Sequence, residues 1–298
     1  MPRDSVRLVV GIPTMGRRHV LSAALPQIAR QTRIPDEVVI CAVAESDVDE
    51  TGFSDLPFPV RVLMSRPGSC RQRNGIIDAT PTSDIVVFLD DDFLMEPSYL
   101  ARVEQLFIMH PDIAVATGKV LADGILGPGI SVADGARLLE SRADLGSLSG
   151  DVQPIYNAYG CNMAVRMSAV RRGDLRFDEN LPLYGWLEDV DFSRMASAHG
   201  RVVTLGSLQG IHLGIKVARS SGMRLGYSQV ANPIYLMRKG TMNVRHALYQ
   251  MVRNFAANTV RAWRPEPWVD RRGRLKGNLR AIGDLLRGRL APQNVRNL

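Results

Sequence analysis

Short runs of β-branched and aliphatic residues alternate with helix-like segments through the first 120 residues. The apolar runs predict strands at 6–12, 38–43, 60–63, 85–89 and 113–118. Apolar residues recur at helical spacing between them, and helices are predicted at 18–31, 71–79 and 97–110. Strands that alternate with helices in this way are typical of βαβ units. We therefore expect an α/β fold whose mostly parallel central sheet is flanked by helices.

The pattern is less regular after residue 121. Residues 122–155 are rich in Gly, Ser and Asp, and no element is predicted there. A strand at 160–165, a short helix at 168–172 and a strand at 201–205 follow. Helical periodicity returns at 242–263 and 279–290. This division predicts one large domain over residues 1–240 and a mainly helical extension over 241–298.

Charge is distributed unevenly along the chain. From Ile215 onward there are 17 Lys and Arg against 3 Asp and Glu, so this part carries +14 and residues 1–214 carry −7. A basic tail of this kind indicates a nucleic acid, an anionic membrane surface or a phosphorylated ligand. Because Trp263, Trp268 and leucines interleave with the charges, we expect the tail from about Trp263 onward to lie on an anionic membrane. The alternative is a basic face that covers the main domain or forms a homo-oligomer interface.

Cysteine usage and hydropathy bear on localisation. Cys41, Cys70 and Cys161 are widely spaced and lack metal-ligand spacing, which favours reduced thiols in a cytosolic protein. The first residues show no signal-peptide pattern, and no apolar run approaches the roughly 20 residues that span a bilayer. We expect a cytoplasmic protein, with peripheral attachment to the inner face of the cell membrane through the basic tail.

The first candidate site is the acidic triplet Asp90-Asp91-Asp92, which ends the predicted strand 85–89. Adjacent carboxylates repel one another unless a positive charge lies among them. In open α/β sheets, ligands bind outside the carboxyl ends of the strands. Since Mg²⁺ and Mn²⁺ favour carboxylate oxygens together with substrate phosphates, the triplet predicts a divalent-cation site. The alternative is a solvated acidic turn before the next helix.

A second acidic group, Glu188, Asp189 and Asp191, opens a predicted helix behind Trp186. A helix N-terminus keeps a carboxylate ionised, which suits a general base. The alternative is ordinary capping, with Asp191 paired to Arg194. Trp186 is interpreted either as a flat platform for a sugar ring or as core packing.

Two further stretches carry weaker signals. His212 follows the strand 201–205 between glycines, and both a metal ligand and a hydrogen-bonded structural histidine fit this placement. The first strand ends in Ile12-Pro13-Thr14-Met15-Gly16-Arg17, which lacks Gly-x-Gly-x-x-Gly, so a Rossmann-type dinucleotide fold is not supported. Backbone groups and Arg17 could still approach a nucleotide there.

Taken together, these stretches resemble the family 2 inverting glycosyltransferases of the GT-A fold over roughly residues 5–240. The resemblance implies a nucleoside-diphosphate sugar donor, a divalent metal and inversion at the anomeric carbon. The matching segments, in order, are Ile12-Pro13-Thr14, Gln31-Thr32 with Pro35-Asp36-Glu37, Arg73-Asn74-Gly75, Leu89-Asp90-Asp91-Asp92, and Trp186-Leu187-Glu188-Asp189-Val190-Asp191 with His212 downstream.

The resemblance also implies roles for individual residues. Asp92 looks like the firmest metal ligand, joined by Asp90 and His212. Asp189 resembles the catalytic base, with Glu188 and Asp191 as the next candidates. Tyr184 and Trp186 are assigned to the acceptor. The residues assigned to the donor are Pro13, Thr14, Arg17, Glu45, Arg73, Asp90 and Asp91.

One departure from the family pattern concerns the nucleotide. The family usually has an aspartate at the end of the second strand that contacts the base. Ala42 stands at this position, and Glu45 and Asp47 are the two candidate substitutes. A UDP-sugar is favoured, but the identity of the nucleotide stays open.

The expected function is therefore an inverting glycosyltransferase that depends on Mn²⁺ or Mg²⁺. Its acceptor would be a hydroxyl of a glycan or lipid-linked saccharide in the synthesis of cell-surface polysaccharide. One alternative is a sugar-phosphate nucleotidyltransferase, although no Gly-rich loop bearing Lys or Arg follows the first strand. The other is a non-enzymatic protein that binds nucleic acid or anions with its tail. No recognised nucleic-acid-binding motif is present, so we expect no nucleic-acid partner.

Overall fold

The computed structural model describes residues 6–142, 152–217 and 221–298. Within these residues, nine strands form one sheet in the order β3-β2-β1-β4-β8-β6-β9-β5, with β7 beside β9. β3, β2, β1 and β4 are parallel, as are β6 and β9, while β8 lies antiparallel between β4 and β6. The predicted α/β fold is confirmed. The strands are β1 (Leu8–Pro13), β2 (Glu37–Ala42), β3 (Val60–Met64), β4 (Ile85–Leu89), β5 (Phe93–Met95), β6 (Ile113–Asp123), β7 (Val152–Pro154), β8 (Asn162–Arg166) and β9 (Arg201–His212).

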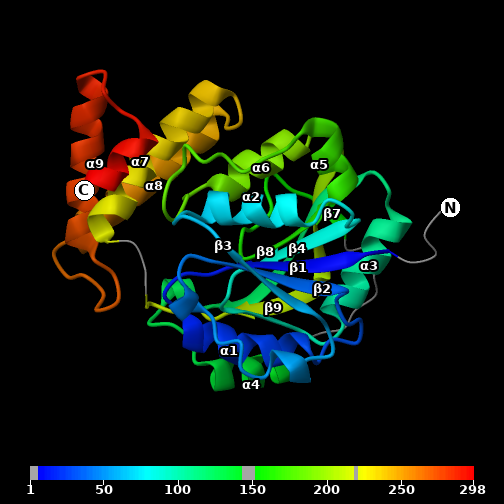
Figure 1. The fold of residues 1–298 in the computed structure, drawn as a ribbon. Coiled ribbons are helices and arrows are strands. Elements are labelled where there is room, and N and C mark those ends of the chain that lie inside the picture. Colours follow the sequence, from blue (N-terminus) through cyan, green and yellow to red (C-terminus); the bar gives the residue numbers. More distant parts are fainter. Residues whose placement is uncertain (1–5, 143–151, 218–220) are drawn as a thin grey trace.

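Helices cover both faces of the sheet (Figure 1). In the first strand, Val10 faces a core that includes α1 and α3, whereas Val9 faces a core that includes α2, α5 and α6. Because both faces of the parallel strands are buried, polar side chains are pushed to the strand ends. The helices in these two layers are α1 (Arg18–Ile28), α2 (Ser69–Ala79), α3 (Tyr99–Met109), α5 (Met167–Gly173) and α6 (Glu188–Ala196).

Residues 122–155 contain more regular structure than their composition predicts. β6 continues to Asp123, a 3₁₀ turn follows at Gly124–Leu126, and α4 spans Val132–Arg142. Residues 143–151 of this region lie outside the described part. β9 is also longer than predicted and ends at His212, because it pairs with β6 on one side and with β5 on the other. These two extended strands carry Asp123 and His212 to the same edge.

The C-terminal part is a bundle of α7 (Gly222–Lys239), α8 (Val244–Arg261) and α9 (Arg271–Leu286), which lies beside the sheet in Figure 1. A 3₁₀ helix, Pro292–Asn297, closes the described chain. Buried amide side chains hydrogen-bond across all three helices: Asn258 Nδ2 donates to Gln229 Oε1 (2.8 Å) and to Asn278 Oδ1 (2.9 Å). Such a network specifies one arrangement of the helices, since each buried amide needs its partners. Every helix in the described part of the chain is too short or too polar to cross a bilayer.

α7 connects the bundle to the sheet. Leu236 is packed in the core that contains α6, whereas Tyr227 and Ile234 are packed against α9. The helix was not predicted, because Gly226 and Pro233 interrupt its pattern. Since α7 takes part in both cores, the predicted boundary at residue 240 stays a prediction.

The crossing of α7 and α9 supplies a test of the bundle. A Cβ on Gly277 would lie 2.1 Å from the carbonyl oxygen of Met223, so the backbones would have to separate. We expect Gly277→Ala to lower the free energy of unfolding by about 1–3 kcal/mol, the usual cost of overpacking. Gly283→Ala in the same helix is the matched control, because its Cβ would meet only the end of the Arg287 side chain. The control should be neutral or gain up to about 1 kcal/mol from helix propensity.

The measurement is urea unfolding of both variants beside the wild type. Equal stability of Gly277→Ala and Gly283→Ala would contradict the close crossing.

Candidate active site

The candidate site lies where β4 and β9 end. Asp90, Asp91 and Asp92 form the turn between β4 and β5, and β5 then pairs antiparallel with β9. In that pairing Phe93 is opposite His212, which places the imidazole beside the Asp92 carboxylate. Strand pairing therefore joins two sequence signals that lie 120 residues apart.

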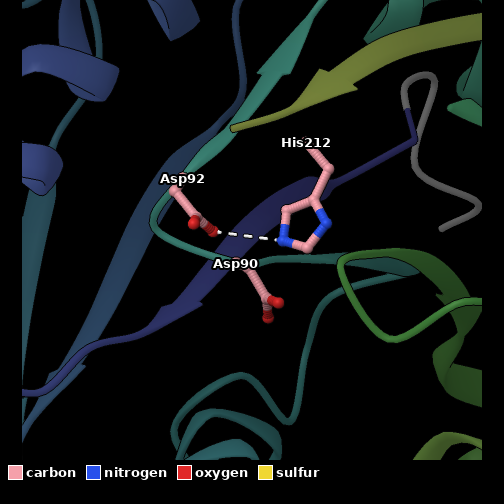
Figure 2. A group of neighbouring side chains, drawn as sticks. All are labelled: Asp90, Asp92 and His212. Atoms are coloured by element: carbon pink, nitrogen blue, oxygen red, sulfur yellow. Dashed lines mark ion pairs between the residues drawn. The ribbon is translucent and has the colours of Figure 1, made fainter. Parts of the chain in front are cut away.

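Asp90, Asp92 and His212 present a set of convergent ligand atoms (Figure 2). One oxygen from each carboxylate and one imidazole nitrogen all lie within 4.8 Å of one another. Asp92 and His212 are buried, whereas Asp90 is partly exposed. Two carboxylates and an imidazole suit Mn²⁺, and the same carboxylates with substrate phosphates suit Mg²⁺.

Asp92 shows that the group fits a cation. Its Oδ2 accepts a hydrogen bond from the Ile215 N–H (2.8 Å), but its Oδ1 is buried without a hydrogen-bond partner among the described residues. That oxygen lies 3.4 Å from His212 Nε2. A buried, unpaired carboxylate oxygen is costly unless a positive charge is close. The residues present therefore fit a divalent cation at this position.

Without a cation, the site is held by its own charges. Burial opposes ionisation of Asp92, but the nearby His212, whose Nε2 lies 3.4 Å from Oδ1, and Arg17 lower its pKa to about 2. Burial also opposes a charge on His212, yet Asp123 and Asp92 raise its pKa to about 10. An imidazolium thus neutralises the carboxylates, and a cation that binds Nε2 must displace its proton.

Asp123 and Tyr159 support His212 and were not found from the sequence. Asp123 Oδ1 lies 2.8 Å from His212 Nδ1, and the Tyr159 hydroxyl donates to Asp123 Oδ2 (3.0 Å). The Tyr159 ring stands edge-on to the imidazole at 5.9 Å. A carboxylate on one ring nitrogen of a histidine orients the other nitrogen toward a metal. The one sequence signal for Asp123 would have been its place after the predicted strand 113–118, which pairs with the strand that carries His212.

Asp91 points toward β1. The Thr14 hydroxyl donates to its Oδ2 (2.7 Å), and Arg17 donates to its Oδ1 (2.9 Å). Burial raises the pKa of Asp91 to about 6, although Arg17 opposes this shift. Two of the predicted donor residues, Thr14 and Arg17, therefore contact the acidic triplet, and Pro13 is the last residue of β1 before them.

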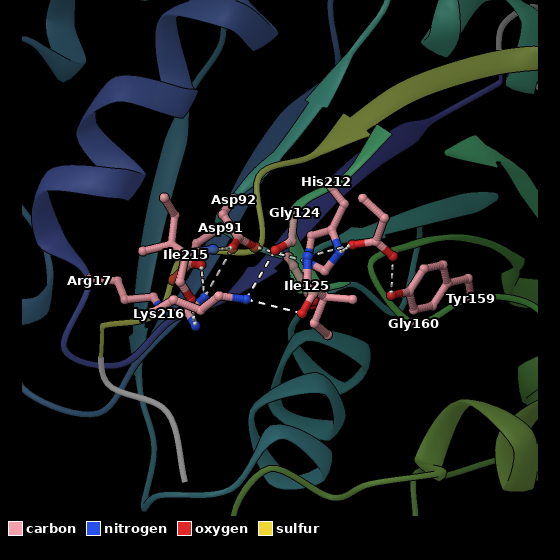
Figure 3. A network of polar contacts seen from close by, with 12 residues as sticks. Arg17, Asp91, Asp92, Gly124, Ile125, Tyr159, Gly160, His212, Ile215 and Lys216 are labelled. Atoms are coloured by element: carbon pink, nitrogen blue, oxygen red, sulfur yellow. Dashed lines mark hydrogen bonds and ion pairs between the residues drawn. The ribbon is translucent and has the colours of Figure 1, made fainter. Parts of the chain in front are cut away.

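A strap of residues 213–217 crosses the site after β9 (Figure 3). Arg17 donates to the carbonyl oxygens of Ile215 (3.2 Å) and Val217 (3.1 Å). Lys216 Nζ donates to the carbonyl oxygens of Gly124 (3.0 Å) and Ile125 (3.1 Å). Two basic side chains therefore fasten the strap, Arg17 next to the acidic triplet and Lys216 to the turn after β6.

Asp189 stands at the start of α6. Its Oδ2 accepts from the Gly160 N–H (3.1 Å) and its Oδ1 from the Val190 N–H (2.8 Å). The preceding Leu187 has φ 74°, a left-handed conformation that turns the chain sharply into the helix. Burial raises the pKa of Asp189, while the two backbone donors oppose the shift. The carboxylate is thus fixed in direction and more basic than in water.

Arg73 links the two acidic groups. It forms an ion pair with Glu188, donates to Asp90 Oδ1 (3.1 Å) and donates to the Gly160 carbonyl oxygen (2.9 Å). The side chain is almost fully buried. Burial raises the pKa of Glu188, and the adjacent charge of Arg73 opposes this shift. Glu188 therefore serves this ion pair, while Asp189 beside it faces Gly160.

Asp191 contacts the end of α7 and the turn after it. It is fully buried, and Lys239 Nζ (2.7 Å) and Thr241 Oγ1 (2.6 Å) each donate to its carboxylate. Its partner is Lys239 of α7, rather than the Arg194 considered in the sequence. This pair attaches α6 to the C-terminal bundle.

The predicted acceptor residues Tyr184 and Trp186 line a shallow hollow. Tyr184 is exposed, and Trp186 is partly buried against the core. Asn232 Nδ2 donates to the Trp186 carbonyl oxygen (2.7 Å), so α7 holds this loop. The hollow is completed by the bundle residues Arg224, Leu225, Ser228 and Val295.

The comparison with known families decides the classification. A model described as "Glycosyltransferase like family 2" matches residues 5–205, about two thirds of the chain. The chain belongs to glycosyltransferase family 2. The resemblance inferred from the motifs is therefore confirmed, and a comparison with curated proteins found no match.

Solved structures share the GT-A fold of this family 2 member. S. aureus TarS 1–349, in complex with UDP-GlcNAc, aligns with a TM-score of 0.58 at 16% identity, covering 97% of this chain and 83% of that chain. Mannosyltransferase PcManGT from Pyrobaculum calidifontis, in complex with GDP-Man and Mn²⁺, aligns with a TM-score of 0.53 at 18% identity, covering 96% and 81%. A longer S. aureus TarS chain gives a TM-score of 0.51 at 18% identity, and this chain spans only 40% of its length.

The substitutes for the family's second-strand aspartate differ in their contacts. Asp47 is buried, and its carboxylate accepts from the N–H groups of Gly16 (2.8 Å), Val43 (3.1 Å) and Ala44 (2.9 Å). Glu45 is exposed. Asp47 thus organises the loops after β1 and β2 through its carboxylate, and a donor contact by the exposed Glu45 stays a prediction.

The charge on His212 predicts a pH dependence in the presence of EDTA. A folded pKa of about 10, above the unfolded value of about 6.5, stabilises the protein fully below pH 6.5. This contribution is lost as the pH rises toward 10, so the free energy of unfolding should fall across that window. Asp123→Asn should flatten the fall, because it removes a hydrogen-bonded charge that raises the pKa.

Urea unfolding at pH 6.5, 8 and 9.5 measures the effect, with His212→Gln as the reference that lacks the titrating group. A wild-type profile no steeper than that of His212→Gln would contradict the assignment.

Proposed function

We propose that the protein is an inverting, divalent-metal-dependent glycosyltransferase that moves a sugar from a nucleoside-diphosphate sugar to a hydroxyl acceptor. The observation that carries the proposal is the pair of acidic groups joined by Arg73. One group, Asp90 and Asp92 with His212, offers ligands to a cation, and the other presents Asp189 separately. A single displacement needs a charge-neutralising site for the leaving diphosphate and a base for the acceptor hydroxyl.

A nucleotide-sugar donor is supported by the family and by the ligands of structurally similar proteins. TarS 1–349 is in complex with UDP-GlcNAc, and PcManGT is in complex with GDP-Man and Mn²⁺. We favour a UDP-sugar, with Mn²⁺ or Mg²⁺ as the cation. Asp92, Asp90 and His212 would hold that cation, which supplies Lewis-acid neutralisation of the charge that develops on the diphosphate. The donor would contact Pro13, Thr14, Arg17, Glu45, Arg73, Asp90 and Asp91.

The protein's own side chains prepare the transfer. Arg73 fixes the carboxylate of Asp90, and Arg17 fixes that of Asp91. Both carboxylates would then be held in position for contact with the donor. Asp189 is oriented by two backbone N–H groups and made more basic by burial, so it would accept the proton of the acceptor hydroxyl. Inversion follows because the hydroxyl attacks opposite the leaving diphosphate.

The acceptor would be a saccharide or a lipid-linked saccharide in the synthesis of cell-surface polysaccharide. Tyr184 and Trp186 offer aromatic faces to a sugar ring at the edge of the hollow beside α7. We place the enzyme in the cytoplasm, attached peripherally to the inner face of the membrane by its basic C-terminal helices. A homo-oligomer is the other use proposed for this surface.

The donor is tested by incubating the protein with a panel of UDP- and GDP-sugars, with and without Mn²⁺ or Mg²⁺. We expect release of the nucleoside diphosphate only with a cation, and calorimetry should show cation-dependent donor binding. Asp92→Asn should weaken donor binding by about 10–100-fold, because a negative ligand with a buried oxygen is lost. Unchanged Mn²⁺-dependent affinity in Asp92→Asn would refute the cation site, and no release with any donor would refute the activity.

The base is tested by Asp189→Asn, which keeps the shape of the side chain. Donor affinity should stay nearly intact, while transfer should fall by about 10²–10⁴-fold, the usual contribution of general-base catalysis. Asp191→Asn is the matched control in the same helix, since Asp191 pairs with Lys239. Asp191→Asn should lower the free energy of unfolding but leave turnover of the folded protein nearly unchanged. If turnover collapsed in Asp191→Asn while Asp189→Asn stayed active, the general base would be Asp191 instead of Asp189.

A further inference from the structure

The outward face of α8 is apolar. Val244, Leu248, Tyr249, Val252 and Val260, with Trp263 just after the helix, are each more than half exposed, from 51% at Leu248 to 87% at Trp263. Apart from the adjacent Leu248 and Tyr249, they are spaced three, four or eight residues apart, which places them on one side of the helix. A surface helix normally turns its polar side outward, and a contiguous exposed apolar stripe marks an interaction surface.

The opposite face of α8 already has its partners. Ala247 is fully buried in the core that contains α6, and Asn258 is fully buried in the amide network with α7 and α9. Met251 packs into the core between the bundle helices. The orientation of the helix is therefore fixed from inside, and the exposed stripe is additional to what the fold needs.

The charge beside this stripe indicates what would cover it. α8 contains no acidic residue, while Arg245 and Arg253 are exposed on it and Arg264 follows in the turn to α9; Arg261 at its end is paired with Glu266. A partner that presents negative charge over an apolar interior matches both the exposed arginines and the apolar stripe. A second copy of this chain fits poorly, because a symmetric contact through α8 would bring Arg245 and Arg253 of both copies together, and α8 has no acidic residue to pair with them.

We propose that α8 docks in the plane of an anionic lipid bilayer. Its apolar stripe would enter the boundary between headgroups and acyl chains, and its arginines would contact lipid phosphates. Tyr249 and Trp263 carry the amphipathic rings that settle at such boundaries. This docking rests on the proposed function, because a lipid-linked acceptor would require the enzyme to work at a membrane, and it specifies which helix makes the peripheral attachment. It also moves the contact from residues after Trp263 to the helix before it.

The test uses the full chain and vesicles of phosphatidylcholine alone or mixed equally with phosphatidylglycerol. We expect co-sedimentation with the mixed vesicles at low salt, and weaker binding as salt screens the arginines. Val252→Asn with Val260→Asn removes apolar surface without changing charge and should weaken binding by about tenfold. The matched control is Ile108→Asn with Met64→Asn, two exposed apolar residues of the sheet domain. It should bind within about twofold of the wild type.

Two further measurements keep the outcomes separate. Fluorescence of the wild type should shift to the blue on binding, and Trp263→Phe should lose most of that shift. Sedimentation velocity without vesicles should give the same mass for the wild type and the α8 variant. Failure of the wild type to bind mixed vesicles, equal binding by the α8 variant, or a dimer that the α8 variant abolishes would each overturn the docking.

The same samples are assayed for release of nucleoside diphosphate, so that the two proposals fail separately. A protein that releases nucleoside diphosphate but ignores the vesicles overturns the docking alone. A protein that binds through α8 but releases nothing with any donor supports the docking and overturns the proposed function alone.

Discussion

The buried guanidinium of Arg73 holds together the parts of the site that come from different elements. It contacts Asp90 after β4, Glu188 in α6 and the carbonyl oxygen of Gly160 before β8. Loss of one partner of a buried ion pair leaves an uncompensated charge, at a cost of about 3–5 kcal/mol. This one side chain therefore bridges the acidic turn after β4 and the start of α6.

The parts of the structure that follow from local pattern were predictable. An apolar run that ends in carboxylates identified β4 and the acidic turn, and acids behind an aromatic residue identified the start of α6. Alternation of strands and helices predicted the parallel sheet. In each of these cases a short stretch indicates both a secondary-structure element and the reactive side chains next to it. The prediction therefore did not depend on contacts with distant segments.

The remaining parts depend on contacts between distant segments. Asp123 became visible only when β6 paired with β9, since its partner His212 lies 89 residues later. The acids of α6 could not be told apart, because Asp191 finds its partner in α7. α7 itself was missed, since its glycine serves a close helix crossing that no local pattern reveals. The sequence indicated which residues could act, and long-range packing decided which of them face one another.

The positive side chains among the acids also bear on the order of events after synthesis. Arg17, Arg73 and the imidazolium of His212 already balance the triplet, so the carboxylates have counterions within the chain. The polypeptide can therefore fold before any metal arrives, unlike small zinc domains that are unfolded without their ion. Binding of the proposed cation would then exchange one proton for one cation in a finished scaffold, and its occupancy would follow the free metal concentration.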